Sequence, residues 1–150
     1  MLHVFIDADA CPVKEETYRV AKRYALAVTV VANQWITMPN DPTIRLEVVD
    51  DGFDAADNWI AERVGAGDIV VSDDIPLSAR CLAKGARVIT GRGEVRDKDT
   101  IGDALAQREL MQYLRGAGDV RGGPKPMQAQ DRNRFMQELD RLVHAVRKHG

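Results

Sequence analysis

Short apolar runs alternate with longer amphipathic stretches along the first 90 residues of the chain. The short runs are rich in β-branched residues and are bounded by turn residues, a pattern typical of strands. The first of them ends in the sequence D-A-D, so two carboxylates stand at the end of an apolar strand. The predicted strands are Leu2–Ile6, Val28–Ala32, Ile44–Val49, Asp68–Ser72 and Arg87–Thr90.

Residues suited to helix starts and ends mark the stretches between and after these strands. Pro12 suits the first position of a helix, where its missing N–H leaves no hydrogen bond unmade. Asp54 suits the N-cap position of another helix. Thr100 and Asp103 form a variant of the capping box. The predicted helices span residues 12–26, 54–64, 76–84, 100–115 and 131–148.

Alternation of strand and helix through residue 90 predicts an α/β fold with a parallel sheet and helices on both of its faces. A chain of 150 residues is typical of one domain that is long enough to bury a core. We expect a single domain over residues 1–150. It consists of an α/β body over 1–115, a Gly/Pro-containing loop over 116–130 and a C-terminal helix over 131–150.

The bulk composition limits the classes of function. The net charge of −2 gives no overall attraction to nucleic acid or to anionic membranes, so any such affinity requires a local basic patch. No apolar run approaches the ~20 residues of a membrane-spanning helix. The chain enters its first strand without a basic or apolar leader, which predicts a cytoplasmic location. Cys11 and Cys81 lack metal-site spacing and are expected to be reduced.

Aspartates follow three of the predicted strands. Because the carboxyl ends of parallel strands meet at one edge of the sheet, we expect these side chains to lie close together. Their mutual repulsion costs free energy unless a cation is present, and carboxylate oxygens suit Mg²⁺ or Mn²⁺. The aspartates are Asp7 and Asp9 after the first strand, Asp50, Asp51, Asp54 and Asp57 after the third, and Asp73 and Asp74 after the fourth.

Ordinary structural roles compete with metal binding at several of these positions. Asp50 and Asp51 precede a glycine and are common turn residues. Asp54 has the capping role described above, and either Asp73 or Asp74 could begin a helix. Asp9 remains open between a metal ligand, a residue that supports a ligand, and a helix-start residue.

Basic residues gather in the sequence around the Gly/Pro-containing loop, and a basic rim near the acidic pocket would bind a phosphate backbone. A solvated surface is the alternative. Asn33 ends the second strand at the same edge as the carboxylates, although asparagine also begins loops. The basic set is Arg92, Arg115, Arg121, Lys125, Arg132 and Arg134. The predicted nucleic-acid contacts are Asn33, Arg92, Lys125 and Arg132.

Four stretches resemble the YaiI/YqxD family of bacterial proteins over nearly the whole chain. The resemblance implies a PIN-like nuclease fold, which is a three-layer α/β sandwich with a metal-binding acidic pocket, and it implies no particular substrate. It is weaker at Asp73. The stretches are Asp7–Lys14, Gly52–Ile60, Asp68–Leu77 and Gly122–Phe135. The acidic positions that it carries over are Asp7, Asp9, Asp54, Asp57 and Asp74.

These observations favour a metal-dependent nuclease that hydrolyses phosphodiester bonds in RNA or DNA, with RNA or another single-stranded nucleic acid as partner and Mg²⁺ or Mn²⁺ as cofactor. The central, mainly parallel sheet should have about five strands. The predicted catalytic residues are Asp7, Asp54, Asp57 and Asp74. The predicted metal ligands are Asp7, Asp9, Asp57, Asp73 and Asp74.

Three other functions remain open. In a phosphohydrolase of the haloacid-dehalogenase type, Asp7 would be the nucleophile and Asp9 the general acid. The lysine that this chemistry needs at a strand end is missing between the D-x-D pair and the later acidic pair. A receiver-like domain phosphorylated at Asp50 would need a lysine where the fifth strand ends in Thr90. A protein that only binds nucleic acid would use the same side chains without catalysis.

Overall fold

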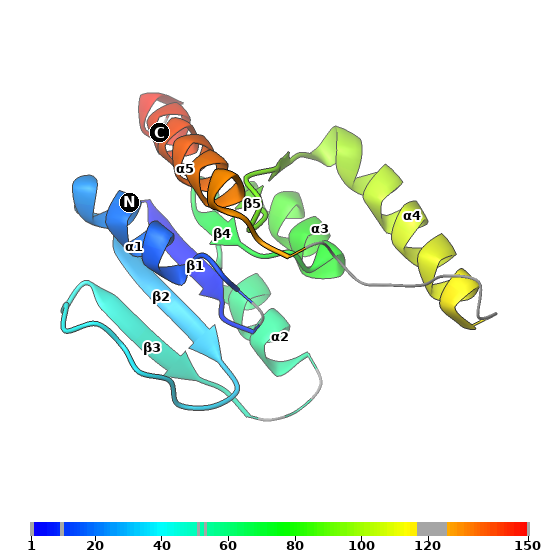
Figure 1. Cartoon of the computed structure of the whole chain (residues 1–150), viewed down its shortest axis with the longest axis horizontal. Coiled ribbons are helices and arrows are strands. Elements are labelled where there is room, and N and C mark those ends of the chain that lie inside the picture. Colours follow the sequence, from blue (N-terminus) through cyan, green and yellow to red (C-terminus); the bar gives the residue numbers. More distant parts are fainter. Residues whose placement is uncertain (1, 10, 51, 53, 117–125, 150) are drawn as a thin grey trace.

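A six-stranded sheet forms the centre of the computed structural model, which describes residues 2–9, 11–50, 52, 54–116 and 126–149 (Figure 1). The strands are β1 (His3–Asp7), β2 (Ala27–Ala32), β3 (Ile44–Val48), β4 (Ile69–Val71), β5 (Arg87–Ile89) and β6 (Val95–Arg96). The helices are α1 (Lys14–Arg23), α2 (Ala55–Arg63), α3 (Ile75–Ala83), α4 (Lys98–Gly116) and α5 (Ala129–His149).

The strand order is β3-β2-β1-β4-β5-β6. From β1 the chain adds strands toward one edge of the sheet, and from β4 it adds them toward the other edge, so the order reverses between β1 and β4. All pairs from β3 to β5 are parallel, as the alternation of strands and helices predicted. β6 pairs antiparallel with β5 and was not predicted, because two residues are too few to give a strand pattern. In open α/β sheets the point of reversal leaves a crevice at the carboxyl ends of the strands, where ligands bind.

Side chains of β1 alternate between two separate cores. Val4 and Ile6 pack with residues of α1 and α5, whereas Phe5 packs with residues of α2 and α3. Figure 1 shows α1 and α5 on one face of the sheet and α2 and α3 on the other. The chain is therefore a three-layer α/β sandwich, which confirms the predicted fold class. The core on both faces fixes the register of β1, because a shift of one residue would exchange the two sets.

The roles predicted for residues at the starts of α4 and α1 differ from those in the structure. α4 begins at Lys98 because the carboxylate of Asp97 accepts the backbone N–H of Thr100 at 2.8 Å and so acts as the cap. The predicted capping box at Thr100 and Asp103 therefore lies inside the helix. α1 begins at Lys14, and Pro12 precedes it rather than occupying its first position.

The two C-terminal helices make different contacts with the body. α5 buries Phe135 and Leu139 completely against the core on the α1 face. α4 packs on α3 and extends away from the sheet, and none of its residues is fully buried (Figure 1). No helix within the described residues is long and apolar enough to cross a membrane.

We expect Phe135→Ala to lower the free energy of unfolding by about 3–5 kcal/mol, because it leaves a cavity where a fully buried ring stood. Urea unfolding followed by circular dichroism measures the change. The matched control is Leu110→Ala on α4, whose side chain is 55% exposed and should change stability by about 0.5 kcal/mol or less. Equal effects of the two substitutions would contradict the docking of α5 on the core.

Candidate functional site

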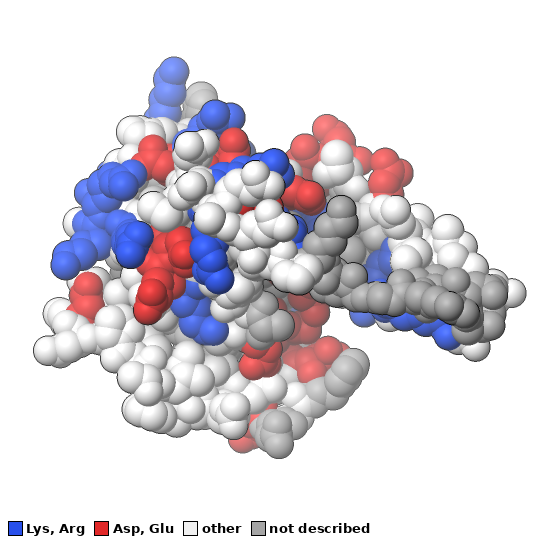
Figure 2. Space-filling model, viewed as in Figure 1, with Lys and Arg blue, Asp and Glu red and all other residues white. Residues whose placement is uncertain are grey.

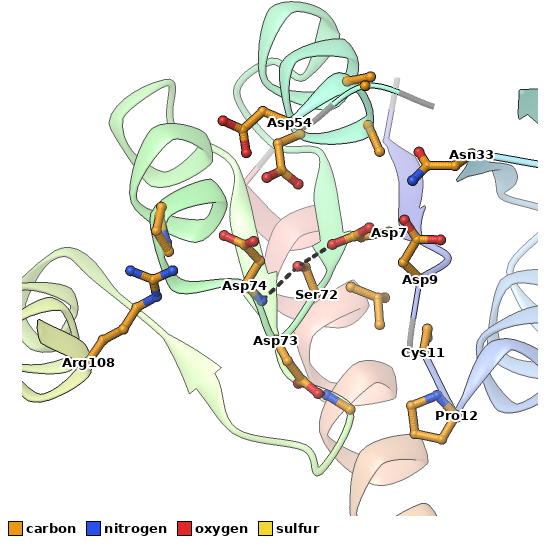
Figure 3. Close-up of a pocket in the computed structure, with 17 residues that line it drawn as sticks. Asp7, Asp9, Cys11, Pro12, Asn33, Asp54, Ser72, Asp73, Asp74 and Arg108 are labelled. Carbon is orange, nitrogen blue, oxygen red and sulfur yellow. Dashed lines mark hydrogen bonds between the residues drawn. The ribbon is translucent and has the colours of Figure 1, made fainter. Parts of the chain in front are cut away.

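The carboxyl ends of β1 and β4 open onto a pocket of about 440 Å³ at the point where the strand order reverses. All six predicted site aspartates line it, as does Asn33. Figure 3 shows Asp7, Asp9, Asp54 and Asp74 around the same space, whereas the side chain of Asp73 points away from it. Asp50 does not line this pocket, and Asp51 and Lys125 lie outside the described residues. The aspartates that line the pocket are Asp7, Asp9, Asp54, Asp57, Asp73 and Asp74.

Ser72 joins the two central strands at the floor of this pocket. Its hydroxyl donates to Oδ2 of Asp7 at 3.0 Å and accepts the backbone N–H of Asp74 at 3.0 Å (Figure 3). One buried hydroxyl therefore fixes the Asp7 carboxylate relative to the start of α3. Ser72 was not predicted as a site residue, although a polar residue at the end of an apolar strand was a signal in the sequence.

Asp73 and Asp74 each hold a loop as well as lining the pocket. Asp74 caps α3, since its Oδ1 accepts the N–H of Leu77 at 2.8 Å. Asp73 accepts the N–H of Gly91 at 2.8 Å and so anchors the turn that follows β5. Of the two candidates for the helix-start role, Asp74 fills it.

Asp54 occupies the N-cap position of α2 without capping it, so the predicted capping role is wrong. Its backbone is left-handed, with φ of 67°, and its side chain forms no cap hydrogen bond. A left-handed non-glycine residue carries a conformational cost. The carboxylate instead lines the pocket beside Asp57, which lies three residues later on the same side of α2.

Two carboxylates of the pocket ionise with difficulty. Burial is the main cause that raises the pKa of Asp7 to about 6, and the charges of Asp57, Asp74 and Asp9 add to it, whereas the Ser72 hydrogen bond opposes it. Burial likewise raises the pKa of Asp57 to about 6, with further contributions from Asp74 and Asp54 and an opposing one from Arg80. The repulsion expected from the sequence is therefore present in the folded chain.

The donor atoms of the pocket suit a hydrated hard cation. Oδ1 of Asn33 is buried and has no hydrogen-bond partner within the described part of the protein, so it is available as a neutral oxygen donor. Among the described residues, no three His, Cys, Asp or Glu side chains form a group that could hold a metal ion directly. Mg²⁺ typically keeps several waters and uses one or two carboxylates, so the available donors fit such an ion.

Two of the predicted basic contacts, Arg92 and Arg132, are not among the residues that line this pocket. Arg92 forms an ion pair with Asp131 at 3.2 Å, and Arg132 forms one with Glu16 at 3.2 Å, so both attach α5 to the body. The arginine that lines the pocket is Arg108, from α4, which the sequence did not indicate because its position depends on how α4 packs against α3.

Cys11 also lines the pocket but is unsuited to nucleophilic chemistry. Burial is the main cause that raises the pKa of its thiol to about 11, so the thiol is protonated at neutral pH. Cys11 is a free cysteine in the structure, as the sequence predicted.

The raised pKa of Asp7 predicts how stability depends on pH in the absence of divalent cations. In the unfolded chain this carboxyl has its usual pKa of 3.8, so the folded chain binds the proton more tightly. The resulting stabilisation is fully present below about pH 4 and is lost as the pH rises through about 6. The difference between the two pKa values corresponds to about 3 kcal/mol, which solvent at the open side of the pocket reduces.

We therefore expect Asp7→Asn to raise the free energy of unfolding by about 2 kcal/mol at pH 8 in EDTA and to change it little at pH 4. Urea unfolding at both pH values measures the difference. The control is Asp103→Asn, which removes the same charge from an exposed position on α4. A loss of stability at pH 8 on substitution of Asp7 would show that its ionised form is not destabilising.

Comparison with known proteins places the chain in a family. The model of the family described as "Uncharacterized BCR, YaiI/YqxD family" matches residues 5–145. A UPF0178 protein of Rhodospirillum centenum is 55% identical over 152 residues, which cover 99% of both chains. A UPF0178 protein of Paramagnetospirillum magneticum is 50% identical over 148 residues, which cover 99% of this chain and 98% of the relative. The chain therefore belongs to the YaiI/YqxD family, as the resemblance of its motifs predicted.

Proposed function

We propose that the protein is a metal-dependent nuclease that hydrolyses phosphodiester bonds of RNA or DNA in the acidic pocket. The observation that supports this most is the pair of aspartates, Asp7 and Asp57, whose pKa values are raised to about 6 at the reversal point of the sheet. Perturbed carboxyl groups gathered in one pocket are typical of active sites. If such carboxyl groups bound no ligand, their burial and mutual repulsion would only cost folding free energy.

The side chains of the pocket suit two different tasks. Asp7 is oriented by Ser72 and would hold the ion, with Asn33 contributing its free oxygen. Bound Mg²⁺ or Mn²⁺ would supply positive charge that stabilises the phosphate oxygens during the reaction.

Asp57 forms no side-chain hydrogen bond with the described residues, and its pKa near 6 suits a general base at neutral pH. It would accept a proton from the water that attacks phosphorus, while the bond from phosphorus to one ester oxygen breaks. Solvent would supply the proton that this leaving oxygen takes up.

The pocket offers less support to the phosphohydrolase alternative. The described lining of the pocket contains no lysine. The ammonium group of Lys14 instead donates a hydrogen bond to the backbone carbonyl of Cys11 at 3.1 Å. An aspartyl-phosphate mechanism needs a cation of that kind near the nucleophile. The other alternative, binding without catalysis, is an outcome of the experiment that follows.

We expect the purified protein to cleave single-stranded oligonucleotides when Mn²⁺ or Mg²⁺ is present and to leave them intact in EDTA. Asp7→Asn should lower the cleavage rate by about 100-fold or more. Replacing a residue that only supports a metal ligand already lowers metal affinity or activity by about 10- to 100-fold, and Asp7 would be a ligand itself. Cleavage of end-labelled RNA and DNA on denaturing gels measures both effects.

The matched control for charge is again Asp103→Asn, which should cleave at the wild-type rate. Binding of oligonucleotides without cleavage under any tested metal would favour the non-catalytic alternative. Cleavage that is equally fast in the Asp7→Asn variant would remove the acidic pocket from the reaction.

A further inference from the structure

A second hollow of about 450 Å³ lies beside the acidic pocket, between α4, β6 and the start of α3. Arg108 lines both hollows, so the two meet at this side chain. Figure 3 shows Arg108 extending from α4 in the direction of Asp74. We call the second hollow the arginine groove, and its polar lining consists of Glu94, Arg96, Gln107, Arg108, Gln112 and Arg115.

The arginine groove has an excess of positive charge that the protein leaves unpaired. Its three arginines face one glutamate, and within the described residues none of the three forms an ion pair. Nε of Arg96 is buried without a hydrogen-bond partner in that part of the chain. By contrast, Arg92 and Arg132 are neutralised by carboxylates. A buried donor without a partner costs free energy, which an anionic ligand would recover.

The arginines are spaced to contact more than one anionic group. Met111 and Arg115 lie three and seven residues after Arg108, so the three side chains share one face of α4. Seven residues correspond to about 10 Å along a helix axis, which exceeds the spacing of successive phosphates along one strand. Figure 2 shows Lys and Arg side chains along the arm that α4 forms, across a gap from Asp and Glu side chains of the body.

We propose that the arginine groove binds the backbone of a single-stranded nucleic acid while a neighbouring phosphodiester of the same strand occupies the acidic pocket. This rests on the proposed nuclease function and adds the path of the substrate beyond the reacting bond. Arg108 lies where the two parts of the path meet.

A single strand fits this path better than a duplex. It is flexible enough to place one phosphate beside the half-buried Asp7 and the next ones in the groove, whereas a duplex is stiff over much longer distances. The described residues that line the groove include no aromatic side chain on which bases could stack. Binding there should therefore depend on phosphate charge and salt rather than on base sequence.

Binding of a fluorescein-labelled 12-nucleotide single strand, followed by anisotropy in EDTA at several salt concentrations, tests the groove without any cleavage. The double variant Arg96→Gln/Arg115→Gln removes two phosphate contacts. For a single strand, each phosphate contact contributes about 0.7 to the slope of log affinity against log salt concentration. That slope should therefore become less steep by about 1.4, and the affinity at 0.1 M salt should fall roughly 20-fold. A duplex of the same sequence should bind more weakly than the strand.

Two further variants keep the measurement decisive. Arg19→Gln/Arg141→Gln removes the same charge from α1 and α5 on the opposite face of the sheet and should leave affinity unchanged. Arg96→Lys/Arg115→Lys keeps the charge and should retain the wild-type slope. If Arg96→Gln weakens folding, Arg115→Gln alone, at an exposed position, should lower affinity by about 5-fold.

The outcomes separate this proposal from the nuclease proposal. Equal affinities of the groove variant and the control variant, or an equal affinity for the duplex, would overturn the arginine groove even if the wild type cleaves RNA or DNA. Binding that depends on Arg96 and Arg115 in a wild type that cleaves nothing would support the groove and overturn the nuclease reaction.

Discussion

The hydrogen bond from Ser72 to Asp7 connects the carboxyl ends of the two central strands, and the geometry of the pocket depends on it. Ser72 also accepts the backbone N–H of Asp74, so the start of α3 is held against the end of β1. Burial and neighbouring charges disfavour the ionised Asp7, and this hydroxyl offsets part of that cost. The remainder must come from the packing of the core on both faces of the sheet.

Arginines serve two purposes in this chain, and the distinction lies in their partners. Arg92 and Arg132 meet carboxylates and join α5 to the body, so their charges are neutralised within the protein. Arg96, Arg108 and Arg115 line a groove whose described lining contains one acidic residue, Glu94. The acidic pocket and the positive groove are therefore neighbours, although the net charge of the whole chain is close to zero. A phosphodiester strand needs both, because its charge repels carboxylates unless a cation and basic groups compensate.

Local pattern predicted the elements well and their termini less well. The five predicted strands follow from short apolar runs, and the five helices follow mainly from the residues suited to their starts and ends. The start of α4 was misplaced, because both Asp97 and Thr100 are good capping residues and only the folded chain shows which one accepts the N–H. The capping role of Asp54 failed for a similar reason, since only the folded chain shows that its backbone is left-handed and that its side chain forms no cap hydrogen bond.

The sequence by itself determined that the aspartates share one edge, because parallel strands joined by helices must all end on the same side. It also determined the family, since the motifs cover nearly the whole chain. Only the tertiary structure decided which groups adjust those carboxylates. Ser72 lies 65 residues from Asp7, and Arg108 reaches the pocket from a helix packed on α3. Burial, pKa and ion pairing depend on distances between such remote residues, and no local pattern encodes them.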